Sequence, residues 1–355
     1  MTHVSADDVG LDVAQAASLS IRRRKRGNGF AYFEDGNRIR DEQTLARIRS
    51  LAIPPAYRDV RISANARAHL QALGRDEAGR HQYRYHPEWE KVRETRKAAR
   101  LGNLVAALPR VRVALRQDVS RRQPDRLKAL ATAVALIDAA HIRVGGEAYL
   151  RANGTRGAAT LLKRHVTIAG GNVSLSFRGK GGAKISCVIS NGSLARSLKR
   201  IVKLPGSRLL QYQGEDGAVR TIQAKDINEY LRHISGTSIS AKDLRTLSAS
   251  ATAAGLLSQL APAEKESARR KQIADVMLAV SADLTNTPTV ARKSYVHDIV
   301  LDAFELGDLP RLLRKCRASR DRSRDERLLC ILVEDALSRS APRKSRSRAQ
   351  SRPPT

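Results

Sequence analysis

Short runs of β-forming residues, separated by glycine and aspartate, occupy the first part of the chain. An aromatic-rich segment at residues 29–36 ends in Glu-Asp-Gly and follows a basic run, a pattern that predicts a β-hairpin. The adjacent prolines at positions 54 and 55 block a helix there. We therefore predict a small β-rich domain with one or two short helices at residues 21–90, after a flexible leader at residues 1–20.

The pattern changes at about Glu88, after which apolar side chains recur at helical spacing. Leu127, Leu130, Val134 and Ile137 are an example. Further segments of the same kind are expected at residues 227–234, 241–260 and 264–284, and another helix is expected to start at Pro288 and to carry Tyr295 about two turns in. These segments predict a mainly helical domain at residues 91–310.

Residues 166–189 interrupt the helical pattern with alternating apolar and polar positions. Glycine turns at 170–171 and 179–182 divide this stretch into three runs, which predicts a three-stranded β-meander. The predicted fold class is therefore α+β, with a small β-rich N-terminal domain and a mainly helical domain that carries a three-stranded β insertion.

Charge narrows the choice of partner. Lys and Arg number 65 against 35 Asp and Glu, a net charge of +30, and this excess favours a polyanion such as nucleic acid. A hydrophobic fraction of 41% is enough for a core, so the chain is not a basic disordered tail throughout. Residues 311–355 are predicted to form a basic extension, disordered from about 339, whose Arg343, Lys344, Arg346, Arg348 and Arg352 bind phosphate non-specifically.

The location is predicted from what the sequence lacks. The sequence contains no apolar run of about 18 residues, the length that predicts a membrane span. Residues 1–20 do not begin with the basic residues of a signal peptide. Cys187, Cys316 and Cys330 are too widely spaced for a disulfide framework or a zinc pair. We expect a cytoplasmic protein in contact with nucleic acid.

The sequence lacks the motifs of several classes of enzyme that act on phosphodiesters. The sequence has no GxxxxGK[ST] loop for an ATP-driven motor and no DxD or HExxH cluster for metal ions. We therefore predict no cofactor and no metal. Chemistry without a metal needs a covalent nucleophile, fixed cations and a proton donor for the leaving oxygen.

Four residues are candidates for these roles. Tyr295 follows Arg292-Lys-Ser and could be a nucleophile, since nearby cations favour a phenolate. Arg143 and Arg245 could hold phosphate oxygens in their planar forks, and Lys180, at the tip of the predicted meander, could donate a proton. Each also has an ordinary interpretation: a surface tyrosine, solvated arginines and a plain phosphate contact.

Residues 79–86 interleave aromatic side chains with residue types that read base edges. Arg80 and Gln82 could contact guanine or adenine, while Tyr83 and Tyr85 could pack on the backbone. The alternative is an edge strand whose tyrosines point inward.

Together, and in this order, the pieces resemble the type IB DNA topoisomerases of the short bacterial and poxvirus-like branch. The matching stretches lie between residues 21 and 306, at 51–55, 69–72, 79–87, 142–147 with Tyr149, 162–165, 177–180, 241–246, and 286–288 with 292–295. The resemblance implies relaxation of supercoiled double-stranded DNA by a monomer that clamps the duplex, through a 3′-phosphotyrosyl intermediate and without ATP or metal.

The resemblance also implies roles for individual residues. Tyr295 matches the nucleophile, Arg143 and Arg245 the two transition-state arginines, and Lys180 the general acid. Asn286 stands where many members carry a histidine that touches a non-bridging oxygen. The DNA-contacting positions implied by the resemblance are Arg80, Gln82, Tyr83, Tyr85 and Tyr149.

Three departures and two alternative functions accompany this interpretation. Gly146 stands where the family has Asn, and Leu247 and Ser248 stand where an aromatic is usual, so we expect altered packing around the two arginines. A tyrosine recombinase shares the chemistry, but its second arginine sits in a His-x-x-Arg box, and Lys242 occupies that His position here. A non-enzymatic basic DNA-binding protein is the other alternative.

Overall fold

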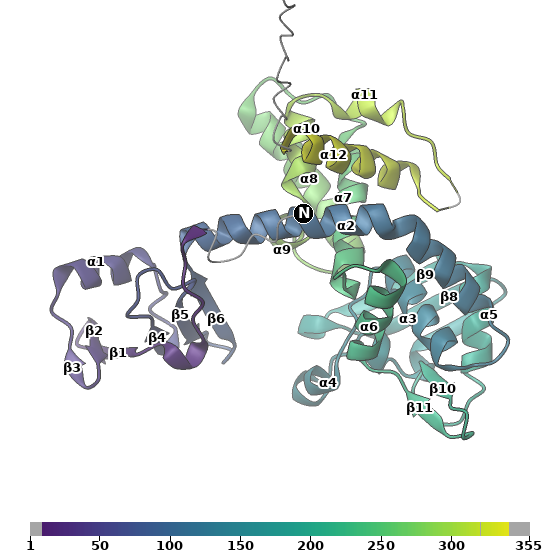
Figure 1. Ribbon diagram of the computed structural model, residues 1–355, viewed down its shortest axis with the longest axis horizontal. Coiled ribbons are helices and arrows are strands. Elements are labelled where there is room, and N and C mark those ends of the chain that lie inside the picture. Colours follow the sequence, from purple (N-terminus) through teal and green to yellow (C-terminus); the bar gives the residue numbers. More distant parts are fainter. Residues whose placement is uncertain (1–8, 320, 341–355) are drawn as a thin grey trace, which may run out of the picture. The chain divides into compact units, whose positions relative to one another are not determined.

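The structure is a computed structural model that describes residues 9–319 and 321–340 of the 355-residue chain. The chain divides into two compact units, with the division between Ala99 and Arg100 (Figure 1). Unit 1 contains a β-sheet, and unit 2 is mainly helical with a three-stranded sheet inserted. The predicted fold class is confirmed.

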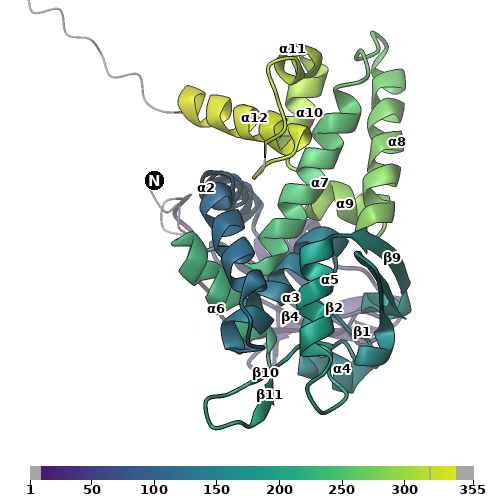
Figure 2. The same cartoon turned by 90° about the vertical axis from the view of Figure 1, so that its right-hand side faces the viewer.

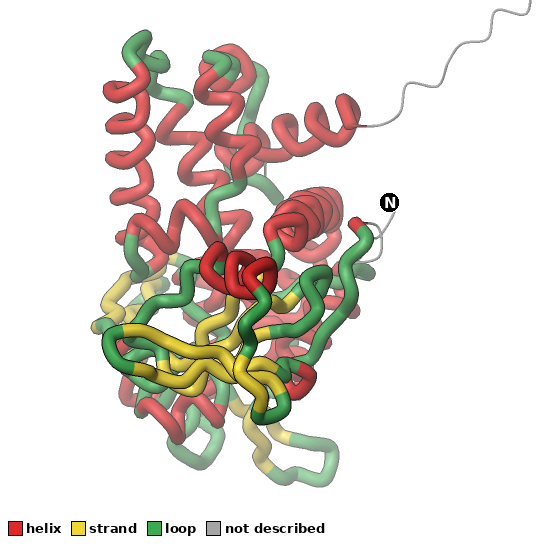
Figure 3. The backbone as a smooth tube through the Cα atoms, turned by 90° about the vertical axis from the view of Figure 1, so that its left-hand side faces the viewer, coloured by secondary structure: helices red, strands yellow, loops and turns green. Residues whose placement is uncertain are grey.

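Unit 1 is built on an antiparallel sheet, whose strands face the viewer in Figure 3. Within the described residues it has six strands in the order β3-β2-β1-β4-β5-β6. The strands are β1 (Ile21–Arg26), β2 (Gly29–Glu34), β3 (Asn37–Arg38), β4 (Arg58–Ile62), β5 (Leu70–Arg75) and β6 (His81–Tyr85). Strands β1 and β2 form the predicted hairpin, and β6 lies at the edge of the sheet.

The adjacent prolines at positions 54 and 55, which are predicted to block a helix, lie in a loop that follows helix α1 (Glu42–Ser50). This helix starts at Asp41, whose carboxylate accepts a hydrogen bond from the Thr44 amide at 2.7 Å, and it ends before the prolines. The Arg23 guanidinium on β1 donates to the carbonyls of Pro54 at 3.2 Å and Tyr57 at 2.6 Å. The proline loop is thereby fixed to the sheet.

The expected flexible leader differs from what the structure shows over residues 9–20; residues 1–8 lie outside the described part. Leu11 and Leu19 are buried, a short 3-10 helix forms at Ala16–Ser18, and the Asp12 carbonyl accepts from the His69 amide at 2.8 Å. The leucines supply apolar area that holds this segment against the sheet. The composition of this segment did not indicate that it packs on the sheet, because the segment is short and acidic.

Helix α2 (Pro87–Ser120) runs across the division between the units. The predicted boundary at residue 90 falls inside its first turns. Those turns belong to unit 1, because the Trp89 ring packs edge-on against His69 at 4.7 Å and Val92 is buried. A domain boundary inside a continuous helix leaves no loop signal in the sequence.

Unit 2 is organised around α3 (Arg126–Ala140), which is apolar on most sides and packs against α5, α6 and α7. Figure 2 shows α7, α8 and α10–α12 at one end of the unit and the inserted sheet with α5 at the other. The helices are α4 (Glu147–Asn153), α5 (Gly192–Ile201), α6 (Ala224–Ser235), α7 (Ala241–Leu257), α8 (Glu266–Leu284), α9 (Pro288–Ser294), α10 (Asp298–Glu305), α11 (Leu309–Leu313) and α12 (Arg324–Ser340).

The predicted meander is confirmed as β7 (Val166–Ala169), β8 (Asn172–Arg178) and β9 (Lys184–Ser190), paired antiparallel in that order. A single 3-10 turn at Lys180–Gly182 connects β8 and β9. A short hairpin of β10 (Gln211–Gln213) and β11 (Val219–Thr221) follows α5. Among the described helices, none is both long and apolar enough to cross a bilayer.

The predicted basic extension after residue 310 is in part an ordered piece of unit 2. Helix α12 packs on α7 and α10, and its Leu328 and Leu329 are fully buried. Arg112 on α2 holds this helix through an ion pair with Glu326 at 2.9 Å. The tail is predicted to be disordered from about residue 339; residues 339 and 340 are the last two of α12, and residues 341–355 lie outside the described part.

Candidate active site

Helix α7 carries Arg245 into the interior of unit 2. The helix starts with Ser240, whose amide donates to the Asp243 carboxylate at 2.8 Å in a capping arrangement. Arg245 lies one turn further and is only 3% exposed. One of its terminal nitrogens donates to the Leu284 carbonyl at 3.0 Å, which fixes the direction of the guanidinium.

Tyr295 lies directly after helix α9, not inside it as the proline-started pattern suggested. Thr287 caps the helix, accepting from the Val290 amide at 3.3 Å, and Pro288 occupies the first turn as predicted. The amides of Tyr295 and Val296 both donate to the Ala291 carbonyl, at 3.1 and 2.9 Å. Tyr295 leaves helical geometry, with φ −128° and ψ −47°, and its side chain is 7% exposed.

The tyrosine ring and the Arg245 guanidinium are in direct contact. The guanidinium carbon lies 5.0 Å from the ring centroid. Burial by itself raises the pKa of the Tyr295 phenol, but the charges of Arg245, Arg143 and Lys242 and a hydrogen bond from Arg245 outweigh it, so the pKa lies below its ordinary value. The site therefore makes the phenol easier to deprotonate than an ordinary tyrosine.

Arg143 enters the site from the segment after α3. His141 ends that helix in the left-handed conformation, with φ 51°, and the chain then turns through Gly145 at φ 75°. Gly157 crosses this segment so closely that an added Cβ would lie 2.4 Å from the Arg143 carbonyl oxygen. Only glycine permits this crossing, which fixes the Arg143 backbone.

Asn286 connects α8 to α9 and has an incomplete hydrogen-bond set. Its backbone amide donates to the Ser281 carbonyl at 3.0 Å. Both polar atoms of its side chain are buried and have no partner among the described residues, and the same is true of the Arg245 Nε. Buried polar atoms without partners are rare, and here they occur on two residues predicted to bind one phosphate.

Lys180 is not part of this buried group. It lies exposed in the β8–β9 turn, as predicted, and its ammonium lies 5.6 Å from the centroid of the half-exposed Tyr149 ring on α4. The structure therefore brings the predicted general acid and a predicted DNA-contacting tyrosine of unit 2 together.

The four candidates of unit 1 lie on or beside edge strand β6. Arg80 and Gln82 both donate to the Asp76 carboxylate at 2.9 Å. Tyr83 is 48% exposed and stacks on the half-buried Tyr85 with ring centroids 6.2 Å apart. Each of the two alternatives drawn from the sequence therefore holds for one tyrosine: Tyr83 faces outward, and Tyr85 packs partly against the sheet.

Two residues at the site were missed or undervalued from the sequence. Lys242 was noted only as a departure from a recombinase box, yet its charge acts on Tyr295. Its position three residues before Arg245, on the same face of α7, was the available signal. Ser250 donates to the Tyr295 carbonyl, and no sequence pattern indicates this contact between residues 45 positions apart.

Of the departures from the family pattern, Ser248 makes a local contact, whereas nothing in the structure requires the glycine at position 146. Gly146 precedes α4, and an added Cβ there would meet nothing within 4 Å. Ser248, which with Leu247 stands where the family usually has an aromatic, hydrogen bonds through its Oγ to the His141 Nε2 at 2.8 Å. The hydroxyl thus holds the end of α3, two residues before Arg143.

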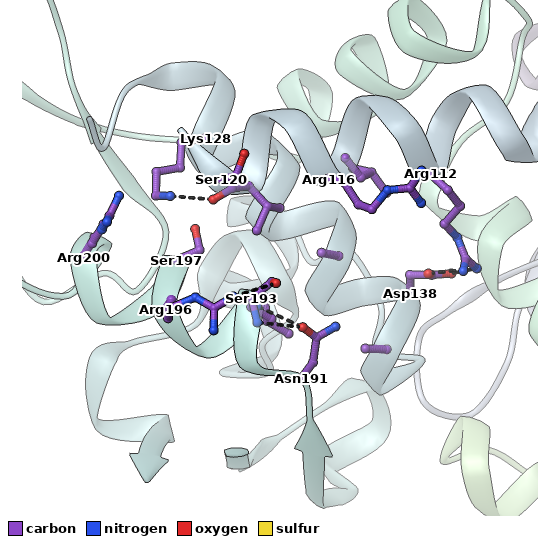
Figure 4. A pocket seen from close by; sticks show the side chains of 15 residues that line it. Arg112, Arg116, Ser120, Lys128, Asp138, Asn191, Ser193, Arg196, Ser197 and Arg200 are labelled. Carbon is purple, nitrogen blue, oxygen red and sulfur yellow. Dashed lines mark hydrogen bonds and ion pairs between the residues drawn. The ribbon is translucent and has the colours of Figure 1, made fainter. Parts of the chain in front are cut away.

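A separate cavity of about 580 Å³ lies between α2, α3 and α5 (Figure 4). It contains none of the predicted site residues. The Lys128 ammonium at its wall donates to the carbonyls of Val119 and Arg121, and Arg112 pairs with Asp138. These cations complete helix ends and ion pairs, so we assign the cavity no part in the chemistry.

Comparisons with known proteins agree with the site. The family model for the catalytic core of eukaryotic DNA topoisomerase I matches residues 86–306, and the model for the N-terminal domain of bacterial DNA topoisomerase IB matches residues 29–76. DNA topoisomerase 1B of Acanthamoeba polyphaga mimivirus is 30% identical over 293 residues, which are 80% of this chain and 87% of the viral protein. The first model alone spans more than half of the sequence. The chain belongs to the type IB DNA topoisomerase family, whose members are isomerases that act on DNA.

Proposed function

We propose that this topoisomerase relaxes supercoiled double-stranded DNA through a covalent bond to Tyr295. The phenol oxygen attacks a backbone phosphorus and forms a 3′-phosphotyrosyl bond, while the bond to the 5′-oxygen breaks and that oxygen takes up a proton. The freed 5′-hydroxyl later attacks the same phosphorus and releases the phenol. One phosphodiester is exchanged for another, so the reaction needs no ATP, and the proposed catalytic groups are all side chains of the protein rather than a metal ion.

The observation that carries this proposal is the buried contact between the Tyr295 ring and Arg245. A phenol with an ordinary pKa near 10 is a weak nucleophile at neutral pH. Here its pKa is lowered by Arg245, Arg143 and Lys242 against the opposing effect of burial. Such an arrangement favours the phenolate at the position where attack must occur.

The arginines and Asn286 are proposed to bind the phosphate during attack. A guanidinium fork pairs with two oxygens, and Arg245 keeps an unpaired Nε beside the tyrosine. The Asn286 side-chain amide donates one hydrogen bond to a non-bridging oxygen without adding charge. The phosphate oxygens would thereby accept hydrogen bonds from the two buried donors that lack partners, the Arg245 Nε and the Asn286 Nδ2.

The remaining assignments concern DNA binding. Arg80, Gln82, Tyr83 and Tyr85 on unit 1 and Tyr149 on unit 2 are proposed to contact the duplex. The net charge of +30 supports long-range attraction to DNA and strong dependence on salt. We further propose that the enzyme acts as a monomer that clamps the duplex, in the cytoplasm and associated with the nucleoid.

A plasmid-relaxation assay tests the proposed reaction. We expect the purified protein to relax supercoiled plasmid in EDTA and without ATP, because all the catalytic groups are side chains of the chain. The ladder of topoisomers on an agarose gel is the measurement. Plasmid that stays supercoiled in EDTA but relaxes when Mg²⁺ is added would contradict the mechanism.

Lys180 is expected to matter only when the leaving oxygen needs a proton. Lys180→Ala should slow cleavage of ordinary DNA by about 10²-fold or more, the usual contribution of a general acid. In a substrate with a sulfur in place of the 5′-bridging oxygen, the leaving group is a thiolate, which needs no proton. The variant should therefore cleave this substrate nearly as fast as the unchanged protein does. Single-turnover cleavage of both substrates is the measurement.

Lys184→Ala is the matched control, because Lys184 is an exposed lysine in the same hairpin. Its effect should be small and equal on the two substrates. If Lys180→Ala impairs both substrates equally, Lys180 acts as a phosphate contact and not as a proton donor.

A further inference from the structure

The chain linking α9 to α10 is held by one buried hydroxyl. Ser250 on α7 is fully buried, and its Oγ donates to the Tyr295 carbonyl at 3.1 Å. The same Oγ accepts a hydrogen bond from the His297 amide, also at 3.1 Å. The hydroxyl therefore contacts the peptide groups on both sides of Val296, which is itself fully buried.

This link is the place where helical hydrogen bonding stops. Helix α9 ends at Ser294, and α10 begins at Asp298 with His297 as its cap, whose Nδ1 accepts from the Ile299 amide at 3.2 Å. Tyr295 therefore has a backbone conformation that no regular element imposes. The Tyr295 amide still bonds to the Ala291 carbonyl of α9, while the contact to the Tyr295 carbonyl comes from another element.

Helix α7 supplies contacts at both ends of the tyrosine. Arg245 lies against the ring, and Ser250, five residues later on the same helix, holds the backbone. A rise of about 1.5 Å per residue separates the two contacts by roughly 7 to 8 Å along the helix axis. The position of the phenol oxygen relative to Arg245 is thus set by one rigid element.

We propose that Ser250 is a positioning residue for the nucleophile: its hydroxyl orients the Tyr295 backbone so that the phenol lies against the Arg245 guanidinium. This inference rests on Tyr295 being the nucleophile. Ser250 does not touch the phosphate, so it acts on the rate of cleavage and not on DNA binding. A displacement of the nucleophile by about 1 Å is enough to slow a reaction by about 10²-fold.

Ser250→Ala tests the proposal by removing both hydrogen bonds without adding volume. We expect single-turnover cleavage at saturating enzyme to slow by about 10- to 100-fold, with DNA affinity unchanged. The substrate with a 5′-bridging sulfur should not restore the rate, because the defect lies in the attacking group. This result would separate Ser250 from a general acid such as Lys180.

Ser258→Ala is the matched control for lost stability. Ser258 is also buried, caps the end of the same helix and donates to the Gly255 carbonyl at 2.6 Å, away from Tyr295. Both variants should lower the unfolding midpoint to a similar degree, but only Ser250→Ala should slow cleavage. Equal cleavage rates in the two variants would overturn the proposal.

Two further measurements keep the test decisive. If Ser250→Ala does not fold, Ser250→Cys retains a side chain of similar shape with a weaker donor and acceptor, and it should still cleave more slowly than Ser258→Ala. A rate equal to that of Ser258→Ala would again overturn the proposal. The slow variants should still form an adduct on Tyr295, whereas absence of an adduct in the unchanged protein would refute the proposed function itself.

Discussion

Replacing Tyr295 by Phe is expected to abolish relaxation and the covalent adduct, with a loss of at least about 10⁴-fold in cleavage rate. The change removes one oxygen atom, the proposed nucleophile, and leaves no second group to form the covalent bond. The ring that packs against Arg245 remains, and so does its burial. Cleavage of a labelled duplex, followed by denaturing electrophoresis, measures the loss.

Binding and folding should survive this substitution. The phenol contributes a hydrogen bond with Arg245, so its removal should change the free energy of unfolding by about 1 kcal/mol. Tyr149→Phe is a suitable comparison, because Tyr149 is half-exposed on α4. It should retain the adduct. A Tyr295→Phe protein that relaxes plasmid at a normal rate would remove Tyr295 from the mechanism.

Replacing Arg245 by Ala is expected to slow cleavage by about 10²- to 10³-fold and to move the pH dependence of cleavage to higher pH. The first effect follows from losing a fixed cation that faces the developing phosphate charge. The second follows because burial, which raises the pKa of Tyr295, would then be opposed only by Arg143 and Lys242. A higher pKa leaves less phenolate at neutral pH. Single-turnover cleavage between pH 6 and pH 10 is the measurement.

Lys242→Ala provides the comparison for charge alone. It also removes a positive charge from α7, but Lys242 has the smallest of the named effects on the pKa of Tyr295. The rate and the pH profile should therefore change less than in Arg245→Ala. An unchanged pH profile in Arg245→Ala would show that this guanidinium does not set the state of the phenol.

Much of the fold was predictable because its signals are local. The alternation in residues 166–189 and the glycine turns indicated the meander, and the proline after Asn286 indicated the start of α9. The end of α9 was not predictable, since it depends on backbone bonds to Ala291 and on Ser250 from another helix. The burial of Leu11 and Leu19 likewise depends on a sheet formed later in the chain.

The site was predictable to the extent that its residues belong to recognisable motifs. The structure brings Tyr295, Arg245 and Arg143 into electrostatic contact, as their proposed shared role requires. It places Lys180 beside Tyr149 instead, and Arg80 and Gln82 on Asp76, contacts that no motif in the sequence indicates. Lys242 and Ser250 carry no motif, so their contributions emerge only from the geometry around the tyrosine.

Mapping the covalent adduct tests the central claim most directly. The protein is denatured during reaction with a duplex labelled on one strand, digested, and the peptide that retains nucleotide is sequenced by mass spectrometry. The account predicts that Tyr295, among the eight tyrosines of the chain, carries the nucleotide through a 3′-phosphate and that the other strand end is a free 5′-hydroxyl. Nucleotide on another residue, or a bond to a 5′-phosphate, would contradict it.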